Sequence, residues 1–180
     1  MGSGLNKVNG YINIDKFQEA APELLMDLEL TPWAIESDCA TEVLFHHSLE
    51  HMGADYKVFF SIIQELYRIC KDEAIIRINA PHPRHDQFIN DPTHVRIITP
   101  ELMSLFSKRL NRQWSESGAP NSQLGLYLNV DFEFIDWQIT VDDKYAELTT
   151  QMSVGEILNY ARERNNVISE YRIVVKAIKH

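Results

Sequence analysis

The chain has 180 residues, of which 44% are hydrophobic, and its 26 acidic residues against 17 basic ones give a net charge of −9. A chain of this length can bury a proper core, and no linker rich in proline, glycine or serine divides it, so we expect a single domain over residues 1–180. The acidic balance, with no cluster of lysine and arginine, argues against nucleic acid or an anionic membrane as a partner.

The sequence also bears on the cellular compartment. No apolar run reaches membrane-spanning length, and the N-terminus lacks a basic segment followed by an apolar core, so we expect a cytoplasmic protein. Cys39 and Cys70 fall at the start of a predicted strand and the end of a predicted helix, positions that suit buried thiols better than a disulfide. This use of cysteine is typical of a reducing compartment.

The first third of the chain contains two short apolar runs that end in acids. Residues 11–15 alternate in polarity and end at Asp15, which predicts a short strand. Residues 23–28 have the same form, stopped by Asp27. Residues 31–35 are predicted to form a loop, because Pro32 disfavours helix in the residue before it.

Residues 42–52 are the stretch around which the chain is organised. The apolar run 43–45 predicts a buried strand, and it is followed by a helical pattern over 55–71 and a second apolar run at 74–78. This order predicts a β-α-β unit with parallel strands. Ligands bind beyond the carboxyl ends of such strands, which are followed here by residues 46–51 and 79–94.

The second half of the chain continues the alternation of strands and helices. Residues 81–95 are too polar and proline-rich for regular structure, and a loop of this length is more often functional than idle. Thr99 and Pro100 predict a helix start, with an apolar face that reaches Leu110. Residues 111–123 are predicted to form a loop.

The last elements are two strands and a helix. Residues 131–141 are strand-like, with a bulge or bend expected at Asp136. A capping box at Ser153 predicts a helix to about Arg164, and residues 171–178 predict a final strand. The alternation from end to end predicts an α/β class.

Four short motifs follow one another along the first third of the chain. They are Gly2-Ser3-Gly4, the glycine and strand of residues 10–15, the Met-Asp-Leu of residues 26–28 and the His-Ser-Leu-Glu-His of residues 47–51. This order resembles class I S-adenosylmethionine-dependent methyltransferases, most closely a small bacterial branch that also has an Asn-Asp-Pro-Thr-His-Val-Arg segment, here residues 90–96. The resemblance implies a Rossmann-like fold with a mostly parallel sheet, helices on both faces and an antiparallel C-terminal strand. It also implies methyl transfer from S-adenosylmethionine to a small polar molecule, such as a sugar or glycan precursor.

The resemblance assigns cofactor-binding roles residue by residue. Gly2, Ser3 and Gly4 would let the backbone approach the methionine end of the cofactor, and Asp15 would bind the ribose hydroxyls. Four further positions complete the expected cofactor site, two at the adenine and two near the sulfonium: Asp27, Leu28, His46 and Ser48.

Catalytic roles fall to residues on the acceptor side. Methyl transfer requires alignment of nucleophile and methyl group and, for some acceptors, removal of a proton. The resemblance places Glu50, His51 and His94 there, with the histidines as candidate bases. In the family a strand precedes the glycines, whereas here only Met1 does. The resemblance therefore describes a sheet with a truncated first strand, and either rearrangement or a homodimer would cover the unpaired edges.

Each of these sites has an alternative interpretation. The glycines could belong to a flexible terminus, the strand-end acids could serve in turns, and Glu50 and His51 could be structural. At the level of the whole protein, a methyltransferase-like domain that binds without catalysis is one alternative. A metal-dependent hydrolase that uses the loop of residues 82–94 is another, because that loop contains His82, His85, Asp86, Asp91 and His94. Our preferred prediction assigns no metal.

Overall fold

The computed structural model describes residues 1–179, which form two sheets and a set of helices. The strands are β1 (Ile14–Asp15), β2 (Leu24–Leu25), β3 (Ala40–His46), β4 (Cys70–Pro81), β5 (Phe132–Val141) and β6 (Ile168–Ala177). The α-helices are α1 (Tyr56–Ile69), α2 (Asp86–Ile89), α3 (Pro100–Ser104), α4 (Lys108–Ser117), α5 (Leu124–Tyr127), α6 (Leu148–Gln151) and α7 (Val154–Ala161). Short 3-10 helices are η1 (Gln18–Ala20), η2 (Leu49–His51) and η3 (Asp143–Tyr145).

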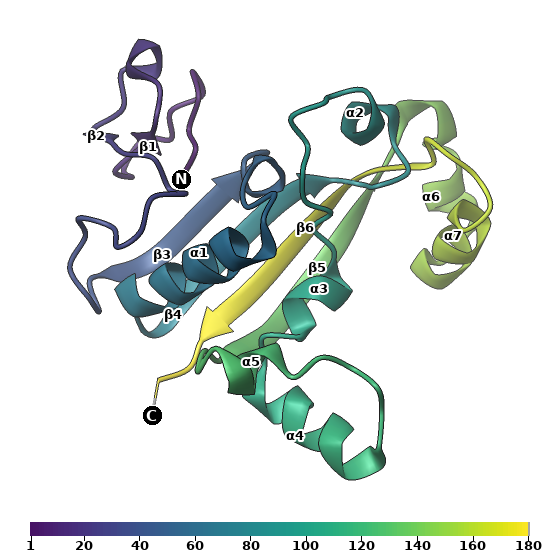
Figure 1. The fold of residues 1–180 in the computed structure, drawn as a ribbon. Coiled ribbons are helices and arrows are strands. Elements are labelled where there is room, and N and C mark those ends of the chain that lie inside the picture. Colours follow the sequence, from purple (N-terminus) through teal and green to yellow (C-terminus); the bar gives the residue numbers. More distant parts are fainter. Residues whose placement is uncertain (180) are drawn as a thin grey trace.

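The larger sheet has four strands in the order β3-β4-β6-β5 (Figure 1). β3 and β4 are parallel and are joined by α1, so the predicted β-α-β unit is confirmed. β6 runs antiparallel to both of its neighbours, β4 and β5, as expected for the C-terminal strand. The mixed α/β class is therefore confirmed.

The N-terminal residues lie between the two sheets (Figure 1). The backbone N–H of Ser3 donates to the carbonyl of Ile14 in β1 at 3.1 Å, and the terminal amine of Met1 donates to the carbonyl of Leu44 in β3 at 2.7 Å. Residues 1–3 thus connect the small parallel sheet of β1 and β2 to the larger one. The carboxyl ends of β1 and β3 are held near each other by this connection.

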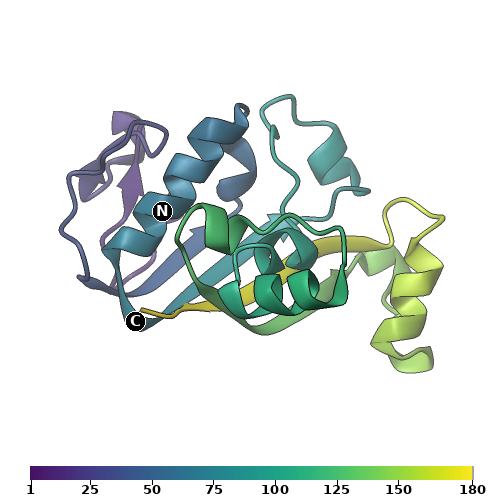
Figure 2. The ribbon, with the colours of Figure 1, turned by 60° about the horizontal axis from the view of Figure 1, so that its bottom comes forward.

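Burial alternates along the strands of the larger sheet. One row across it is largely buried: Val43, Ile76, Val175 and Phe134. The neighbouring row, on the opposite face, is half-buried or exposed: Leu44, Arg77, Val174 and Asp136. Helices α1, α3 and α5 gather over the first face (Figure 2), so the helices are distributed less evenly than the resemblance implies.

Helix α1 supplies most of the cover. Asp55 caps it by accepting the N–H of Lys57, and its buried stripe includes Phe59, Ile63 and Leu66. Burying a side chain of this size stabilises the fold by about 1.5–3 kcal/mol. The helix predicted over residues 55–71 is confirmed, with Ile69 as its last residue.

The helix predicted from Thr99 to Leu110 is divided in two. Thr99 caps α3 as expected, but α3 ends at Ser104, and Ser107 caps a new helix, α4, by accepting the N–H of Leu110. Seven residues of the loop predicted over 111–123 are therefore helical. α4 is mostly exposed and its composition is polar. Its few apolar residues were not enough to predict a helix from the sequence.

Smaller differences have local causes. The strand predicted over 11–15 is limited to its last two residues, because the buried Asn13 side chain bonds the backbone of Val8 and Tyr11 and folds the segment into a turn. The loop of residues 81–95 contains one turn of helix, α2, capped by His85. Cys39 is exposed, although a buried thiol was expected there.

Two further predictions can be compared with the structure. A bulge is confirmed beside Asp136, where the register between β5 and β6 shifts between Phe134 and Asp136. No helix in the described part of the chain is long and apolar enough to cross a membrane.

Candidate active site

A cavity of about 390 Å³ opens between the ends of β1 and β2 on one side and the end of β3 with η2 on the other. It brings together most of the residues that the sequence assigned to the cofactor, and one of those assigned to catalysis. These residues are Gly2, Gly4, Asp15, Asp27, Leu28, Ser48 and His51. They come from segments far apart in the chain, so their convergence is a property of the fold.

Asp15 is fixed in place by the backbone around it. It is 7% exposed, its Oδ2 accepts the N–H of Gly4 at 2.8 Å, and its Oδ1 accepts the N–H of Phe17 at 2.9 Å. Each oxygen of a carboxylate can accept more than one hydrogen bond. Asp15 therefore has acceptor capacity left for a ligand in the cavity.

The two glycines of the N-terminal segment have different reasons to be glycine. Gly2 has a φ of +61°, and a Cβ there would lie 2.6 Å from the Cβ of Ser48, so the segment can approach the end of β3 only without a side chain. Gly4 has a φ of +50°, but a Cβ there would meet nothing within 4 Å. The close approach at Gly2 is thus to Ser48, whereas Gly4 faces open space.

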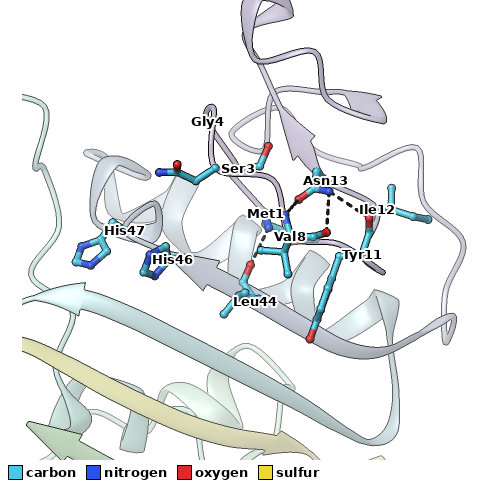
Figure 3. Close-up of a pocket in the computed structure, with 12 residues that line it drawn as sticks. Met1, Ser3, Gly4, Val8, Tyr11, Ile12, Asn13, Leu44, His46 and His47 are labelled. Carbon is cyan, nitrogen blue, oxygen red and sulfur yellow. Dashed lines mark hydrogen bonds between the residues drawn. The ribbon is translucent and has the colours of Figure 1, made fainter.

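A second cavity, also of about 390 Å³, lies on the other side of the N-terminal segment (Figure 3). His46 and Ser3 line this second cavity and not the first, so the structure does not bring these two expected cofactor residues to the others. Gly2, Gly4 and His47 line both cavities. The N-terminal segment thus separates two spaces that share His47 at one end.

His47 is a charged group that sequence reasoning missed. Its Nε2 lies 2.7 Å from Oε2 of Glu170, and its Nδ1 lies 3.7 Å from Oε1 of Glu50. The hydrogen bond to Glu170, and then the nearby carboxylate of Glu50, raise the pKa of His47 to about 9. Hydrogen bonding to His47 lowers the pKa of Glu170 to about 2. The pair therefore places an imidazolium beside both cavities at neutral pH.

The three residues expected on the acceptor side also come together. The rings of His51 and His94 have centroids 4.5 Å apart, and Glu50 lies beside them. The loop that carries His94 is held to η2 because the N–H groups of Val95 and Arg96 donate to the carbonyl of Glu50, at 2.9 and 3.0 Å. His51 and His94, which are 43 positions apart in the sequence, are thus neighbours in the fold.

Comparison with solved structures identifies the fold. A S-adenosylmethionine-dependent methyltransferase from Archaeoglobus fulgidus aligns with 91% of this chain and 74% of its own, with a TM-score of 0.57 and 19% identity. The YcgJ protein of Bacillus subtilis aligns with 93% of this chain and 81% of its own, with a TM-score of 0.48 and 13% identity. An S-adenosylmethionine-dependent methyltransferase from Methanosarcina mazei aligns with 86% of this chain and 66% of its own, with a TM-score of 0.46 and 10% identity. No protein-family model and no curated protein sequence matches the chain.

The chain has the fold of class I S-adenosylmethionine-dependent methyltransferases. In this methyltransferase fold, the cavity at the ends of β1 and β3 lies where open α/β sheets bind ligands. The resemblance in sequence and the likeness in structure therefore point to the same fold.

Several residues of the methyltransferase-fold cavity were not predicted. They are Lys16, Phe17, Met26, Glu29, Met52 and Thr93, besides His47. Four of them, Lys16, Phe17, Met26 and Glu29, lie within two positions of a strand-end acid, so position next to such an acid was a usable signal. The other two, Met52 and Thr93, are direct sequence neighbours of the predicted histidines His51 and His94.

The loop histidines proposed as metal ligands are engaged elsewhere. His82 is buried against the ring of Tyr171, and burial lowers its pKa to about 4. His85 uses Nε2 with Asp142 at 3.1 Å and accepts the N–H of Gln87 at Nδ1. In the described part of the methyltransferase fold these two histidines do not converge with His94, so the cluster required by the hydrolase alternative is not assembled.

Proposed function

We propose that this protein is a S-adenosylmethionine-dependent methyltransferase that acts on a small polar acceptor, for example a sugar or glycan precursor. The observation that carries the proposal is the cavity at the ends of β1 and β3, which gathers Gly4, Asp15, Asp27 and Leu28 in one place. The Archaeoglobus protein with the same fold is a S-adenosylmethionine-dependent methyltransferase, which supports the assignment.

The residues present fit the cofactor. S-adenosylmethionine carries positive charge on its sulfur and its amine, and the cavity is bordered by the carboxylates of Asp15, Asp27 and Glu29. Met26 and Met52 supply apolar surface for an adenine ring. A volume of about 390 Å³ is within the range of small-molecule sites. Asp15 would hold the ribose, and Asp27 with the backbone of Leu28 would meet the adenine.

The chemistry divides between cofactor and protein. When bound, S-adenosylmethionine supplies a methyl group on a sulfonium sulfur, ready for displacement by a nucleophile. The protein has to align the acceptor, exclude water and hold or remove a proton. His51 lines the cavity, and His94 lies against it, so both would act on the acceptor side together with Glu50.

Titration calorimetry with S-adenosylmethionine and S-adenosylhomocysteine tests the proposal. We expect saturable binding of both at one site per chain. If neither ligand binds, the proposal is wrong. If both bind, incubation with a panel of small hydroxylated acceptors separates an enzyme from a binding domain. Release of S-adenosylhomocysteine with at least one acceptor supports catalysis, whereas no release with any of them favours the inactive alternative.

A further inference from the structure

Glu50 is an unusual buried acid. It is 0% exposed, and neither oxygen of its carboxylate has a hydrogen-bond partner in the described part of the chain. The nearest cationic group paired with it is His47, whose Nδ1 is 3.7 Å from Oε1, too long for a hydrogen bond. Buried carboxylates are normally hydrogen-bonded, because leaving water without a partner is costly. Such an acid is typical of a site that is completed by a ligand.

His51 presents a free lone pair beside Glu50. The hydroxyl of Thr93 donates to Oδ1 of Asp91 at 2.6 Å, so its oxygen can only accept from Nδ1 of His51, which lies 2.9 Å away. Nδ1 must then carry the proton of the neutral ring, and Nε2 has the lone pair. A metal-binding histidine has this same arrangement, in which the other nitrogen donates to a partner that fixes the ring.

His94 is oriented by the same principle. Its Nδ1 lies 3.0 Å from the carbonyl of Phe88, which can only accept, so Nδ1 carries the proton and Nε2 has the lone pair. The side chain is 8% exposed, and its ring stacks on that of Phe88, which limits rotation. Both histidines are therefore held with an Nε2 lone pair available before any ligand binds.

One ligand atom from each of Glu50, His51 and His94 lies within 4.8 Å of those of the other two residues. We propose that these three side chains form a binding site for a divalent transition-metal ion, such as Zn²⁺ or Mn²⁺, at the edge of the cavity between β1 and β3. Two imidazoles and a carboxylate are an established ligand set for such ions. Metal–ligand distances of about 2.0–2.2 Å require the three atoms, which lie within 4.8 Å of one another, to move closer together when an ion binds.

Charge and access favour a cation at this place. Glu50 contributes a carboxylate, and a carboxylate oxygen of Asp91 lies 3.8 Å from Nε2 of His94, against one imidazolium, that of His47, at 3.7 Å from Glu50. Three protein ligands leave open positions in the coordination sphere. Because His51 lines the cavity, those positions are accessible from it. The site deepens the proposed function and rests on it in one respect: in a methyltransferase the ion would bind an oxygen of the acceptor.

Metal binding can be measured without cofactor or substrate. Untagged protein, stripped with a chelator, is titrated with Co²⁺ while its visible absorption is recorded, and with Zn²⁺ by calorimetry. We expect one ion per chain and a higher melting temperature with Zn²⁺. Glu50→Gln, His51→Gln and His94→Gln should each weaken binding at least about tenfold. The matched control is His46→Gln, which removes an exposed histidine outside the cluster and should leave binding unchanged.

Thr93→Val is a second test that spares the buried acid. It removes the group that orients His51 at an exposed position, and we expect it to weaken metal binding by about tenfold or more. Wild-type protein that shows no saturable Co²⁺ or Zn²⁺ binding overturns the proposal, and so does equal binding by Glu50→Gln. If the protein binds metal but not S-adenosylhomocysteine, the metal site is supported and the proposed function is contradicted. If it binds S-adenosylhomocysteine but not metal, the proposed function is supported and the metal site is contradicted.

Discussion

The imidazole of His47, immediately after β3, lies 2.7 Å from the carboxylate of Glu170 on β6, Nε2 to Oε2. β4 separates these two strands in the sheet, so the contact bridges across it. Glu170 also accepts from Arg172 at 2.7 Å, through its other oxygen. The position of His47 between the two cavities is thus fixed from the far side of the sheet.

The pair predicts a pH window for stability. The pKa of His47 is raised from 6.5 to about 9, so its contribution is fully present below 6.5 and is lost as the pH rises through about 9. The pKa of Glu170 is lowered from 4.5 to about 2, so its contribution is present above 4.5 and is lost as the pH falls through about 2. Both contributions to stability are complete only between the ordinary pKa values of the two groups, 4.5 and 6.5.

We therefore expect His47→Gln to destabilise the protein most near pH 6 and much less near pH 10. Urea unfolding of wild type and variant in metal-free buffer at the two pH values measures the difference. His46→Gln is the control, because His46 is exposed and has no acidic partner among the ion pairs of the described chain. An equal loss of stability at both pH values would show that the ion pair is not the cause.

Asp15→Asn tests the acid at the end of β1. The asparagine retains one oxygen, which can accept the N–H of either Gly4 or Phe17 but not both, while the charged acceptor for a ribose is lost. We expect the affinity for S-adenosylhomocysteine to fall by about 1–3 kcal/mol. Calorimetry on the variant measures this, with Asp136→Asn, an exposed acid that does not line the cavity, as the control. An affinity unchanged in Asp15→Asn would refute the ribose assignment.

Gly2→Ala tests the contact between the N-terminal segment and β3. A Cβ at Gly2 would lie 2.6 Å from the Cβ of Ser48, and the φ of +61° is unfavourable for alanine. The control is Gly10→Ala, where φ is +84° but a Cβ meets nothing within 4 Å, so only the backbone penalty of about 1–2 kcal/mol applies. We expect Gly2→Ala to lower the free energy of unfolding by more than the control does.

The double variant Gly2→Ala with Ser48→Gly should recover part of that loss, because it removes the atom that clashes and leaves the strained backbone. Urea unfolding of the four proteins gives the comparison. Equal losses in Gly2→Ala and Gly10→Ala would mean that the segment does not pack against Ser48.

His82 predicts a second pH effect on stability, between about pH 6.5 and pH 4. Burial lowers its pKa from 6.5 to about 4, so the neutral ring contributes stability above 6.5 that is lost as the pH falls toward 4. A shift of this size corresponds to about 3 kcal/mol at most. His82→Asn keeps an acceptor for the N–H of Arg84, at present bonded to Nδ1, and does not titrate. Unfolding between pH 7 and 4 should therefore be less pH-dependent in the variant, and parallel curves would contradict the prediction.

Local patterns were sufficient for the central part of the fold. The apolar run before His46, the helical stripe of α1 and the second run in β4 each have a single plausible structure, and their order requires a parallel pair. The residues at the ends of such strands could be placed for the same reason. Asp15 and Asp27 follow apolar runs directly, so their position near a ligand cavity follows from the topology.

The remainder depends on contacts between distant residues. The pairing of His47 with Glu170 joins positions 123 residues apart, and nothing in either segment indicates it. The division between α3 and α4 depends on Ser107 acting as a cap, and α4, although amphipathic, contains few apolar residues that would reveal a helix. His46 and His47 are neighbours in an identical local context, and only the three-dimensional arrangement shows that His47 borders both cavities.

The proposed function requires S-adenosylmethionine to bind in the cavity between β1 and β3. Met26 and Met52 line that cavity, whereas Met103 is in the core and Met152 packs beside α7. Protein labelled with ¹³C at the methionine methyl groups can be titrated with S-adenosylhomocysteine and followed by NMR. We expect the signals of Met26 and Met52 to shift with saturation while those of Met103 and Met152 remain in place. No shift at millimolar ligand, or shifts confined to Met103 or Met152, would contradict the account.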